Sequence, residues 1–143
     1  MALLASKDSH CYVCGPDNQF GLRVPFHRDG PQGSRACYTV RPEHAGWSGL
    51  LHGGVAFALM DEALGRSLYY QNLPAVTARV ETRFLKPITV GSRLIVKAWV
   101  VRQRRRLFDA RAEIRSDGPE NTLLAEADAT MCLIDRSSGK EAP

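Results

Sequence analysis

Two acidic residues interrupt an otherwise apolar stretch between residues 53 and 70 and are the first candidates for chemistry. Asp61 and Glu62 are adjacent there, so on a helix they would project about 100° apart and meet different environments. The spacing of Glu62 and Arg66 predicts an i,i+4 ion pair on an exposed stripe. Asp61 is the better candidate for a general base, because burial of an unpaired carboxylate disfavours its ionised form and suits it to proton transfer.

The second candidate feature is the glycine pair Gly53-Gly54, eight residues before Asp61. Two glycines would leave the first N–H groups of a helix open to close approach, at the positive end of the helix dipole. Such N–H groups can stabilise a carbonyl oxygen on which negative charge develops. His52 precedes the pair and could orient a ligand, cap the helix or pack, and we favour capping or packing.

These residues require one long helix and a sheet to position them. The helix is predicted over residues 53–70, buried on nearly all sides, with its end at Asn72-Leu73-Pro74. Residues 107–116 alternate apolar and charged side chains, which is typical of an antiparallel sheet with one solvated face. Strands are predicted over residues 22–27, 36–41, 76–85, 92–102, 107–116 and 123–134. The predicted fold class is α+β: a curved antiparallel sheet of about six strands wrapped around one long buried helix.

Composition limits the class of protein. The chain has 143 residues, of which 44% are hydrophobic and 24% charged, as expected for one globular domain with a packed core. We expect residues 1–143 to form a single domain with an ordered core over about 11–135, and residues 1–10 and 136–143 to fray. The sequence has neither an apolar run of about 20 residues nor the pattern of a signal peptide. We therefore expect a cytoplasmic protein without a membrane partner.

The charge balance favours anionic partners, since 19 Lys and Arg face 15 Asp and Glu and give a net charge of +4. The densest basic run is Arg104-Arg105-Arg106. We interpret it first as a solvated hairpin turn and second as a phosphate contact. No motif that combines aromatic and basic side chains for base stacking is present, so we expect no nucleic-acid partner.

Four cysteines stand at positions 11, 14, 37 and 132, and without a secretion signal we expect reduced thiols. The spacing Cys11-x-x-Cys14 suggests zinc, but no second pair of ligands follows at suitable spacing. We favour small thiols that pack a loop, with no metal bound. The alternative is a zinc site that takes His10 as a third ligand and a distant Cys as a fourth.

The motif His52-Gly53-Gly54, followed by Asp61, resembles the H-G-G-x₆-D motif of the PaaI-type (phenylacetyl-CoA thioesterase-like) hotdog family. Three further stretches resemble that family: the Cys/Gly-Pro-x-Asn loop over residues 11–22, the Gly-rich approach over 44–51, and the strand over 76–87 that leads to a Pro. The resemblance covers roughly residues 11–134 and agrees with the helix and sheet predicted above. It implies the hotdog fold.

The resemblance also implies an acyl-CoA thioesterase whose active site is shared between two protomers. The Gly53 N–H of one protomer would polarise the thioester carbonyl. Asp61 from the other protomer would be a general base for water or a nucleophile. Thr77 matches a hydroxyl position that orients the water, and His52 would support the loop. No cofactor is implied.

Two positions depart from the family pattern. Gly46 stands where some members carry an Asn that also binds the carbonyl, and Ala45 replaces a polar residue. His44 or an additional backbone amide would have to compensate. The oxyanion site is therefore less fully specified than the carboxylate.

Substrate contacts follow from the chemistry of acyl-CoA. Basic residues near the pocket mouth would bind the phosphates of CoA. These residues are Arg79, Arg83, Lys86, Arg104, Arg105 and Arg106. Each of them could equally serve only to keep the sheet soluble. Apolar residues would line the acyl tail and favour a medium-chain or aromatic acyl group; they are Phe57, Met60, Leu64, Phe84 and Trp47. The glycines Gly46 and Gly54 complete the predicted binding set.

A site built this way needs a homodimer or a dimer of dimers. Two other functions are kept as alternatives. A non-catalytic acyl-CoA-binding hotdog module would use Asp61 only structurally. A hotdog dehydratase or hydratase would need a His/Glu or His/Asp pair that is not found around His52.

Overall fold

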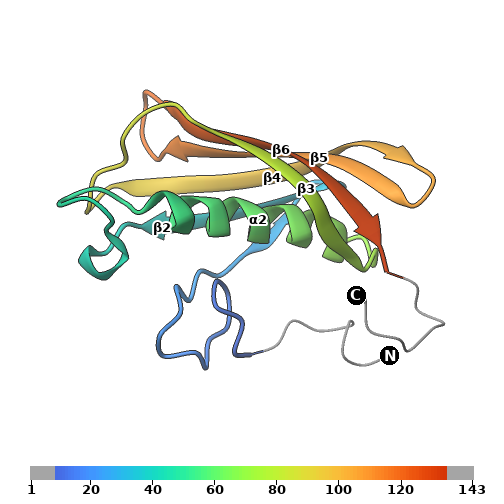
Figure 1. Ribbon diagram of the computed structural model, residues 1–143, viewed down its shortest axis with the longest axis horizontal. Helices are drawn as coiled ribbons and strands as arrows, with labels where there is room; N and C mark the ends of the chain where they lie inside the picture. Colours follow the sequence, from blue (N-terminus) through green and yellow to red (C-terminus); the bar gives the residue numbers. More distant parts are fainter. Residues whose placement is uncertain (1–8, 135–143) are drawn as a thin grey trace.

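The computed structural model describes residues 9–134, which form one antiparallel sheet and one long helix packed against it (Figure 1). The six strands lie in the order β1-β2-β4-β5-β6-β3. They are β1 (His27–Asp29), β2 (Gly33–Thr39), β3 (Ala75–Phe84), β4 (Arg93–Arg104), β5 (Leu107–Ser116) and β6 (Leu123–Leu133). The helix α2 spans Gly53–Tyr69, and a short 3-10 helix, η1, spans Pro42–His44. The predicted fold class is confirmed.

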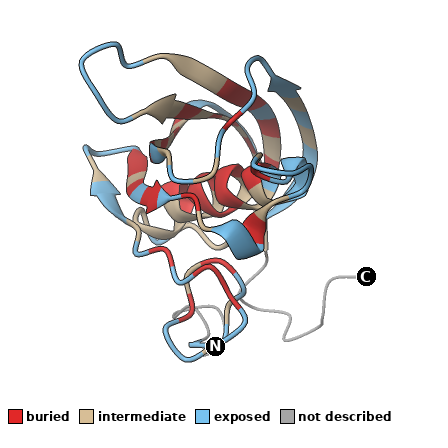
Figure 2. Cartoon of the chain, turned by 90° about the vertical axis from the view of Figure 1, so that its left-hand side faces the viewer, coloured by how far each residue is buried: buried red, intermediate tan, exposed pale blue. Residues whose placement is uncertain are grey.

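The core lies between α2 and the inner face of the sheet, where Figure 2 shows the buried residues gathered. Leu59, Leu64 and Leu68 are fully buried there, and each contributes about 1.5–3 kcal/mol of apolar burial. The inner face of β5 and β6 is mostly alanine, which lets the helix approach the sheet closely; the buried residues are Ala110, Ala112, Ala125, Ala127 and Ala129. The alternation predicted for residues 107–116 is confirmed.

The segment before the helix differs most from the prediction. The prediction of a strand over residues 22–27 is wrong, since β1 begins only at His27 and has three residues. The N–H groups of Leu22 and Val24 donate instead to the carbonyls of Tyr12 and Val13, at 2.8 Å each. The N-terminal loop, residues 9–21, thus takes the hydrogen bonds that a longer strand would have used.

The prediction that α2 is buried on nearly all sides is also wrong. Gly53, Phe57, Asp61 and Gly65 recur at four-residue intervals and are exposed or half-buried, with Phe57 39% exposed. The neighbouring strand β3 is the last in the sheet, and its Phe84 is 57% exposed. These four residues of α2 and the strand β3 together form a partly apolar surface that no described residue covers. We call this surface the α2–β3 strip.

The predicted frayed tails lie outside the described residues, except for Ser9 and His10. Within residues 9–134, no helix has the length and apolar character needed to cross a membrane.

Candidate active site

His52 caps the first turn of α2. Its backbone is extended, its Nδ1 accepts a hydrogen bond from the Gly54 N–H at 2.8 Å, and its carbonyl accepts from Val55 and Ala56. The capping role favoured from the sequence is therefore the observed one. The Gly53 N–H has no hydrogen-bond partner among residues 9–134, and it lies at the positive end of the helix dipole.

The three glycines near His52 differ in what the fold demands of them. A Cβ on Gly54 would lie 3.0 Å from His52 Nδ1, and a Cβ on Gly46 would lie 3.1 Å from His52 Cα, so a side chain at either position would crowd His52. A Cβ on Gly53 would meet only the Phe84 ring, 3.7 Å from Cζ, which is ordinary contact. The packing of this chain therefore leaves room for a side chain at Gly53.

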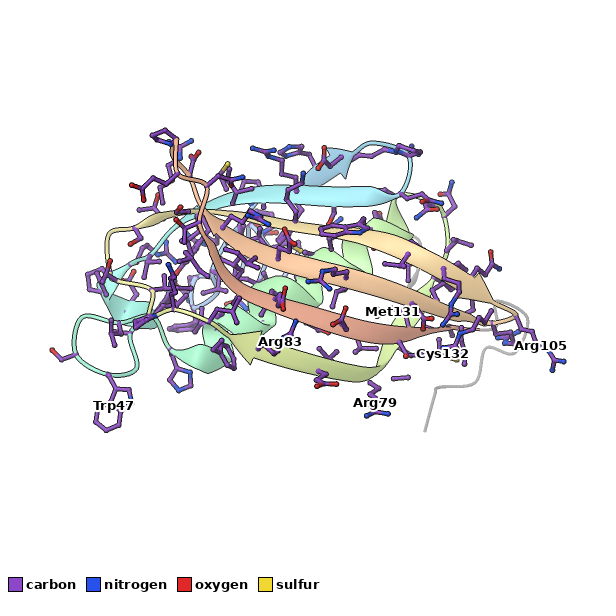
Figure 3. All side chains as sticks on the ribbon, turned by 90° about the horizontal axis from the view of Figure 1, so that it is seen from above. Trp47, Arg79, Arg83, Arg105, Met131 and Cys132 are labelled. Atoms are coloured by element: carbon purple, nitrogen blue, oxygen red, sulfur yellow. The ribbon has the colours of Figure 1, made fainter. Side chains whose placement is uncertain are left out.

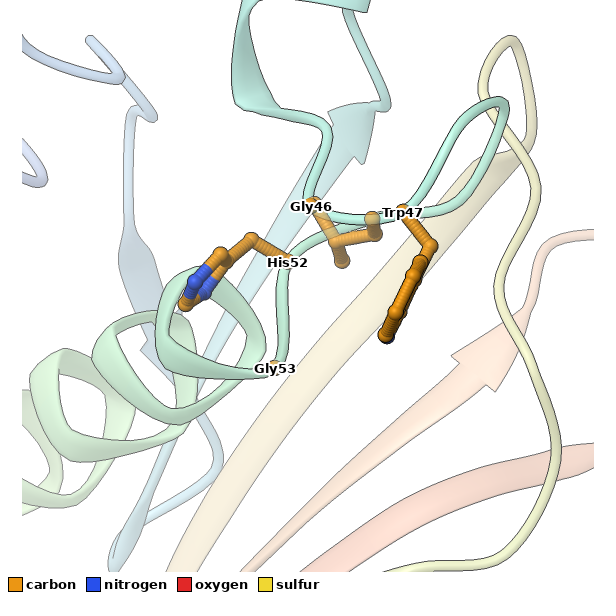
Figure 4. Close-up of a pocket in the computed structure, with 5 residues that line it drawn as sticks. Gly46, Trp47, His52 and Gly53 are labelled. Atoms are coloured by element: carbon orange, nitrogen blue, oxygen red, sulfur yellow. The ribbon is translucent and has the colours of Figure 1, made fainter.

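An open hollow of about 380 Å³ surrounds this turn (Figure 4). Its lining residues are Gly46, Trp47, Leu51, His52 and Gly53. The Trp47 side chain is 85% exposed, so the hollow has an aromatic wall that nothing in the described part of this chain covers. An apolar group placed here would lie directly beside the unpartnered Gly53 N–H.

The structure brings Asp61 and Thr77 together. The Thr77 hydroxyl donates to Asp61 Oδ1 at 2.8 Å, from β3 to α2. The register of β3 shifts between Thr77 and Arg79, and irregularities of this kind redirect side chains. Asp61 is half-buried and has this hydroxyl as a partner, so it is not the unpaired acid expected from the sequence. Its Oδ2 has no partner among the described residues.

Gly53 and Asp61 of one chain lie two turns apart along α2. They are separated by eight residues of helix, which corresponds to about 12 Å at 1.5 Å per residue. To act on one thioester, the Gly53 N–H must lie within about 3 Å of the carbonyl oxygen, and the Asp61 carboxylate must lie within about 3 Å of the attacking water. Both groups nevertheless belong to the same uncovered α2–β3 strip.

Of the predicted replacements for the missing Asn, His44 is buried and the Gly46 N–H is engaged within the loop, so neither of these two groups is available to a carbonyl in this chain. His44 is only 7% exposed, and its ring nitrogens contact Tyr38 Oη at 2.5 Å and Arg41 Nη2 at 3.3 Å. Burial and the nearby Arg41 charge lower the pKa of His44. The Gly46 N–H donates to the Leu50 carbonyl at 2.9 Å. Gly46 serves the site by its small size.

The apolar residues predicted to line the acyl tail divide into two groups. Met60 and Leu64 are fully buried in the core and do not reach the hollow, which corrects their prediction as lining residues. Phe57, Phe84 and Trp47 are exposed around the start of α2. The aromatic members are thus the ones available to a ligand.

The hairpin turn predicted at Arg104–Arg106 is confirmed, and within one chain it lies far from the hollow around Gly53. Arg105 and Trp47 lie at opposite ends of the molecule (Figure 3). Hydrogen bonds from Arg104 and Arg102 hold the pKa of Asp109 below its ordinary value, so Arg104 is engaged.

The remaining basic candidates differ in availability. Arg106 donates to the Leu133 carbonyl at 3.0 Å, and Arg83 forms an ion pair with Glu126. The side chains of Arg79 and Arg105 are exposed and form no ion pair with any described residue.

Glu62 is the residue that sequence reasoning placed wrongly. Its ion pair with Arg66 is confirmed at 3.2 Å, but Glu62 is only 6% exposed. The N-terminal loop covers it: Cys11 Sγ lies 3.7 Å from Glu62 Oε2, and Arg66 Nη2 donates to Cys14 Sγ at 3.0 Å. No local pattern in the sequence indicates which helix face this loop covers.

The family model described as "Thioesterase superfamily" matches residues 48–122, more than half of the 143 residues. The chain belongs to the thioesterase superfamily. This confirms the family and the enzyme class, thioester hydrolases, that the motif predicts. No curated protein matches the chain.

Solved structures share the fold of this thioesterase superfamily member. A point mutant of the phenylacetic acid degradation protein PaaI from Thermus thermophilus is 27% identical, with a TM-score of 0.69 over 79% of this chain and 95% of that one. The E. coli PaaI protein is 23% identical, with a TM-score of 0.73 over 80% and 81%. Another thioesterase superfamily protein reaches a TM-score of 0.80 at 22% identity over 87% of this chain, which spans 60% of that protein's length. The PaaI-type hotdog fold is confirmed.

Proposed function

We propose that this chain hydrolyses the thioester of an acyl-CoA at a site made by two copies, with Gly53 from one and Asp61 from the other. One observation carries the proposal. An unpartnered helix-start N–H and a hydroxyl-bound carboxylate lie on the same uncovered strip, about 12 Å apart in one chain. A second strip facing the first would bring the two groups to one carbonyl.

The chemistry follows from the contacts of these groups. The Gly53 N–H would hold the thioester oxygen, and the helix dipole would stabilise the negative charge that develops there. The Asp61 carboxylate, with Oδ1 held by Thr77, would take a proton from water through Oδ2. The resulting hydroxide adds to the carbonyl carbon and the carbon–sulfur bond breaks. The proton held by Asp61 passes to the departing thiolate, so a carboxylic acid and the CoA thiol leave and the Asp61 carboxylate is regenerated. Direct attack by Asp61, followed by hydrolysis of the anhydride, uses the same groups.

Strand β3 offers the surface for the second copy. It is ten residues long and forms one edge of the sheet, whereas β1 at the other edge has three residues. Long uncovered edges are normally paired or blocked. Antiparallel pairing of β3 with its own copy would form a two-fold dimer in which the two α2–β3 strips face each other. We propose this homodimer, alone or within a dimer of dimers, as the functional unit.

Solved neighbours lend support through what their names state. A Streptococcus mutans protein with a TM-score of 0.71 is described as bound to acetyl CoA. A hypothetical thioesterase from Streptococcus pneumoniae was solved with an Asp and, separately, a Thr replaced by Ala. Those two positions are sixteen residues apart, which is also the separation of Asp61 and Thr77.

The exposed aromatic rings favour an apolar acyl group. Phe57, Phe84 and Trp47 border the start of α2, which suits a medium-chain or aromatic acyl chain better than acetyl. The proposed dimer would also bring the β4–β5 turn of the second copy, with its Arg105 and Arg106, to the end at which Gly53 lies. Those guanidinium groups, together with Arg79 and Arg83, would meet the phosphates of CoA.

The test is a panel of thioesters that comprises acetyl-, hexanoyl-, octanoyl-, benzoyl- and phenylacetyl-CoA. Release of the CoA thiol is followed against a blank that corrects for the protein's own cysteines. We expect turnover of the medium-chain or aromatic substrates to exceed that of acetyl-CoA. Tight binding without turnover of any member would instead support the non-catalytic acyl-CoA-binding module and overturn the proposal.

Replacement of Gly53 by Pro isolates the contribution of its N–H. Pro is well tolerated at the first helical position, and the residue before it, His52, already has the extended backbone that Pro requires. The thermal midpoint should stay near wild type, while kcat/KM falls by a factor on the order of 10²–10³. Gly53→Ala, which keeps the N–H, is the matched control and should lose less activity. Equal losses in both variants would contradict the role of the N–H.

Replacement of Thr77 by Val tests the hydroxyl that holds Asp61. The two side chains have similar shapes, but Val cannot donate to Oδ1. A hydrogen bond to a charged group contributes about 1.5–3 kcal/mol, so kcat should fall by about 10- to 100-fold. Thr77→Ser restores the hydroxyl and should recover most of kcat. If Val and Ser behave alike, the hydroxyl has no part in the reaction.

A further inference from the structure

The N-terminal loop and α2 bring together three potential metal ligands at Glu62, which is buried whereas Asp61 is half-buried. The sulfurs of Cys11 and Cys14 and a carboxylate oxygen of Glu62 lie within 4.8 Å of one another. We propose that Cys11, Cys14 and Glu62 bind a zinc ion that fastens the N-terminal loop to α2. This inference is independent of the hydrolytic site.

The donor types and their separations fit zinc. Zinc combines thiolate sulfur at about 2.3 Å with carboxylate oxygen at about 2.0–2.2 Å in a tetrahedral site. A sulfur and an oxygen on the same tetrahedral ion are then about 3.6 Å apart, and two sulfurs about 3.8 Å apart. Cys11 Sγ already lies 3.7 Å from Glu62 Oε2. Only a small movement of the thiols would complete the three-ligand set, with a water molecule at the fourth position.

The loop backbone fixes the two thiols before any ion binds. The Gly15 N–H donates to the Cys11 carbonyl at 2.8 Å. A Cβ on Gly15 would lie 2.4 Å from Cys11 N, so only glycine can close this turn. The two residues between the cysteines, Tyr12 and Val13, are tied to the rest of the fold through their carbonyls. On this turn the sulfurs of Cys11 and Cys14 lie within 4.8 Å of each other.

Arg66 fits the site as a partner of the ligands. It donates from Nη2 to Cys14 Sγ at 3.0 Å and from Nε to Glu62 Oε1 at 3.2 Å, and this leaves Oε2 on the side of Cys11. Hydrogen-bond donors of this kind orient metal ligands from outside. On binding, each thiol would release its proton to solvent. The charges of Zn²⁺ and Arg66 then balance two thiolates and one carboxylate.

The structure alters the zinc alternative considered from the sequence. That alternative takes His10 and a distant Cys as the additional ligands. Cys37 and Cys132 stand on β2 and β6 and do not belong to the cluster. The third ligand comes instead from Glu62, which is 51 positions from Cys11 in the sequence. Because Glu62 is so far from the cysteines in the sequence, the spacing of ligands along the chain does not reveal the site.

The test measures metal directly on the full chain, kept reduced, loaded with zinc and then dialysed. We expect about one zinc per chain, and cobalt in its place should give sulfur-to-cobalt charge-transfer absorption with the visible bands of a tetrahedral ion. A chelator should lower the thermal midpoint. Wild type that retains no zinc and gives no cobalt–thiolate band would overturn the proposal. If Cys11 and Cys14 are found joined in a disulfide, the protein is reduced and tested again, and failure of the reduced form to bind zinc would also overturn it.

Matched variants locate the metal. Cys14→Ala and Glu62→Gln should lose the zinc, whereas Cys37→Ala and Cys132→Ala remove a thiol elsewhere and should keep it. Retention of stoichiometric zinc by Cys14→Ala would overturn the assignment. Should a cluster variant fail to fold, the wild-type zinc content and cobalt spectrum still decide. None of these readouts depends on thioester hydrolysis.

Discussion

Asp61→Asn should reduce kcat for a good acyl-CoA substrate by a factor on the order of 10²–10⁴. The amide keeps the size of the carboxylate, and its oxygen can still accept the Thr77 hydrogen bond seen at 2.8 Å. It cannot take a proton from water, and it is a poor nucleophile. The interaction that is lost acts mainly in the transition state, so KM should change little. Initial rates of CoA thiol release over a range of substrate concentrations give both constants.

Asp128→Asn provides the matched control for this result. Asp128 is on β6, its side chain is 62% exposed, and its ion pair is with Arg111 on the outer face of the sheet. The same chemical change there should leave kcat within about twofold of wild type, as expected for a surface site. If Asp61→Asn were as active as Asp128→Asn, Asp61 would be neither base nor nucleophile, and the proposed chemistry would fail.

The fold was predictable because the sequence periodicities report burial within one chain. Alternation over residues 107–116 places Phe108 and Ile114 in the core, as observed. The apolar stretch from residue 53 gives the helix with its start at Gly53. The same reasoning fails for Phe57, which is 39% exposed, because hydropathy alone does not distinguish a residue buried in the core from one that a second copy could cover.

The candidate site was predictable where residue types conflict with their surroundings. Asp61 interrupts an apolar helix, and Gly53 begins one, so both are conspicuous in the sequence. The contact of Thr77 with Asp61 depends on an irregularity in the register of β3, which periodicity does not indicate. The burial of Glu62 depends on a loop 51 positions earlier. Contacts between distant segments are thus the part that pattern reasoning misses.

Mixing two inactive variants should restore activity if the site is shared between copies. A Gly53→Pro chain keeps Asp61, and an Asp61→Asn chain keeps Gly53. Each homodimer then has two defective sites, but a mixed dimer has one site with both lesions and one with none. Random assembly of equal amounts makes half of the dimers mixed, so about a quarter of all sites are intact. Because only these intact sites turn over substrate, the mixture should show about 25% of the wild-type kcat per chain.

The measurement uses chains denatured together and refolded, with each variant refolded alone for comparison. Asp61→Asn mixed with Thr77→Val is the control, because Asp61 and Thr77 come from the same chain and every site in the mixed dimer keeps one lesion. That mixture should show no more than the mean of its two parents. If the Gly53→Pro and Asp61→Asn mixture also gave only the mean of its parents, the two groups would not meet across an interface.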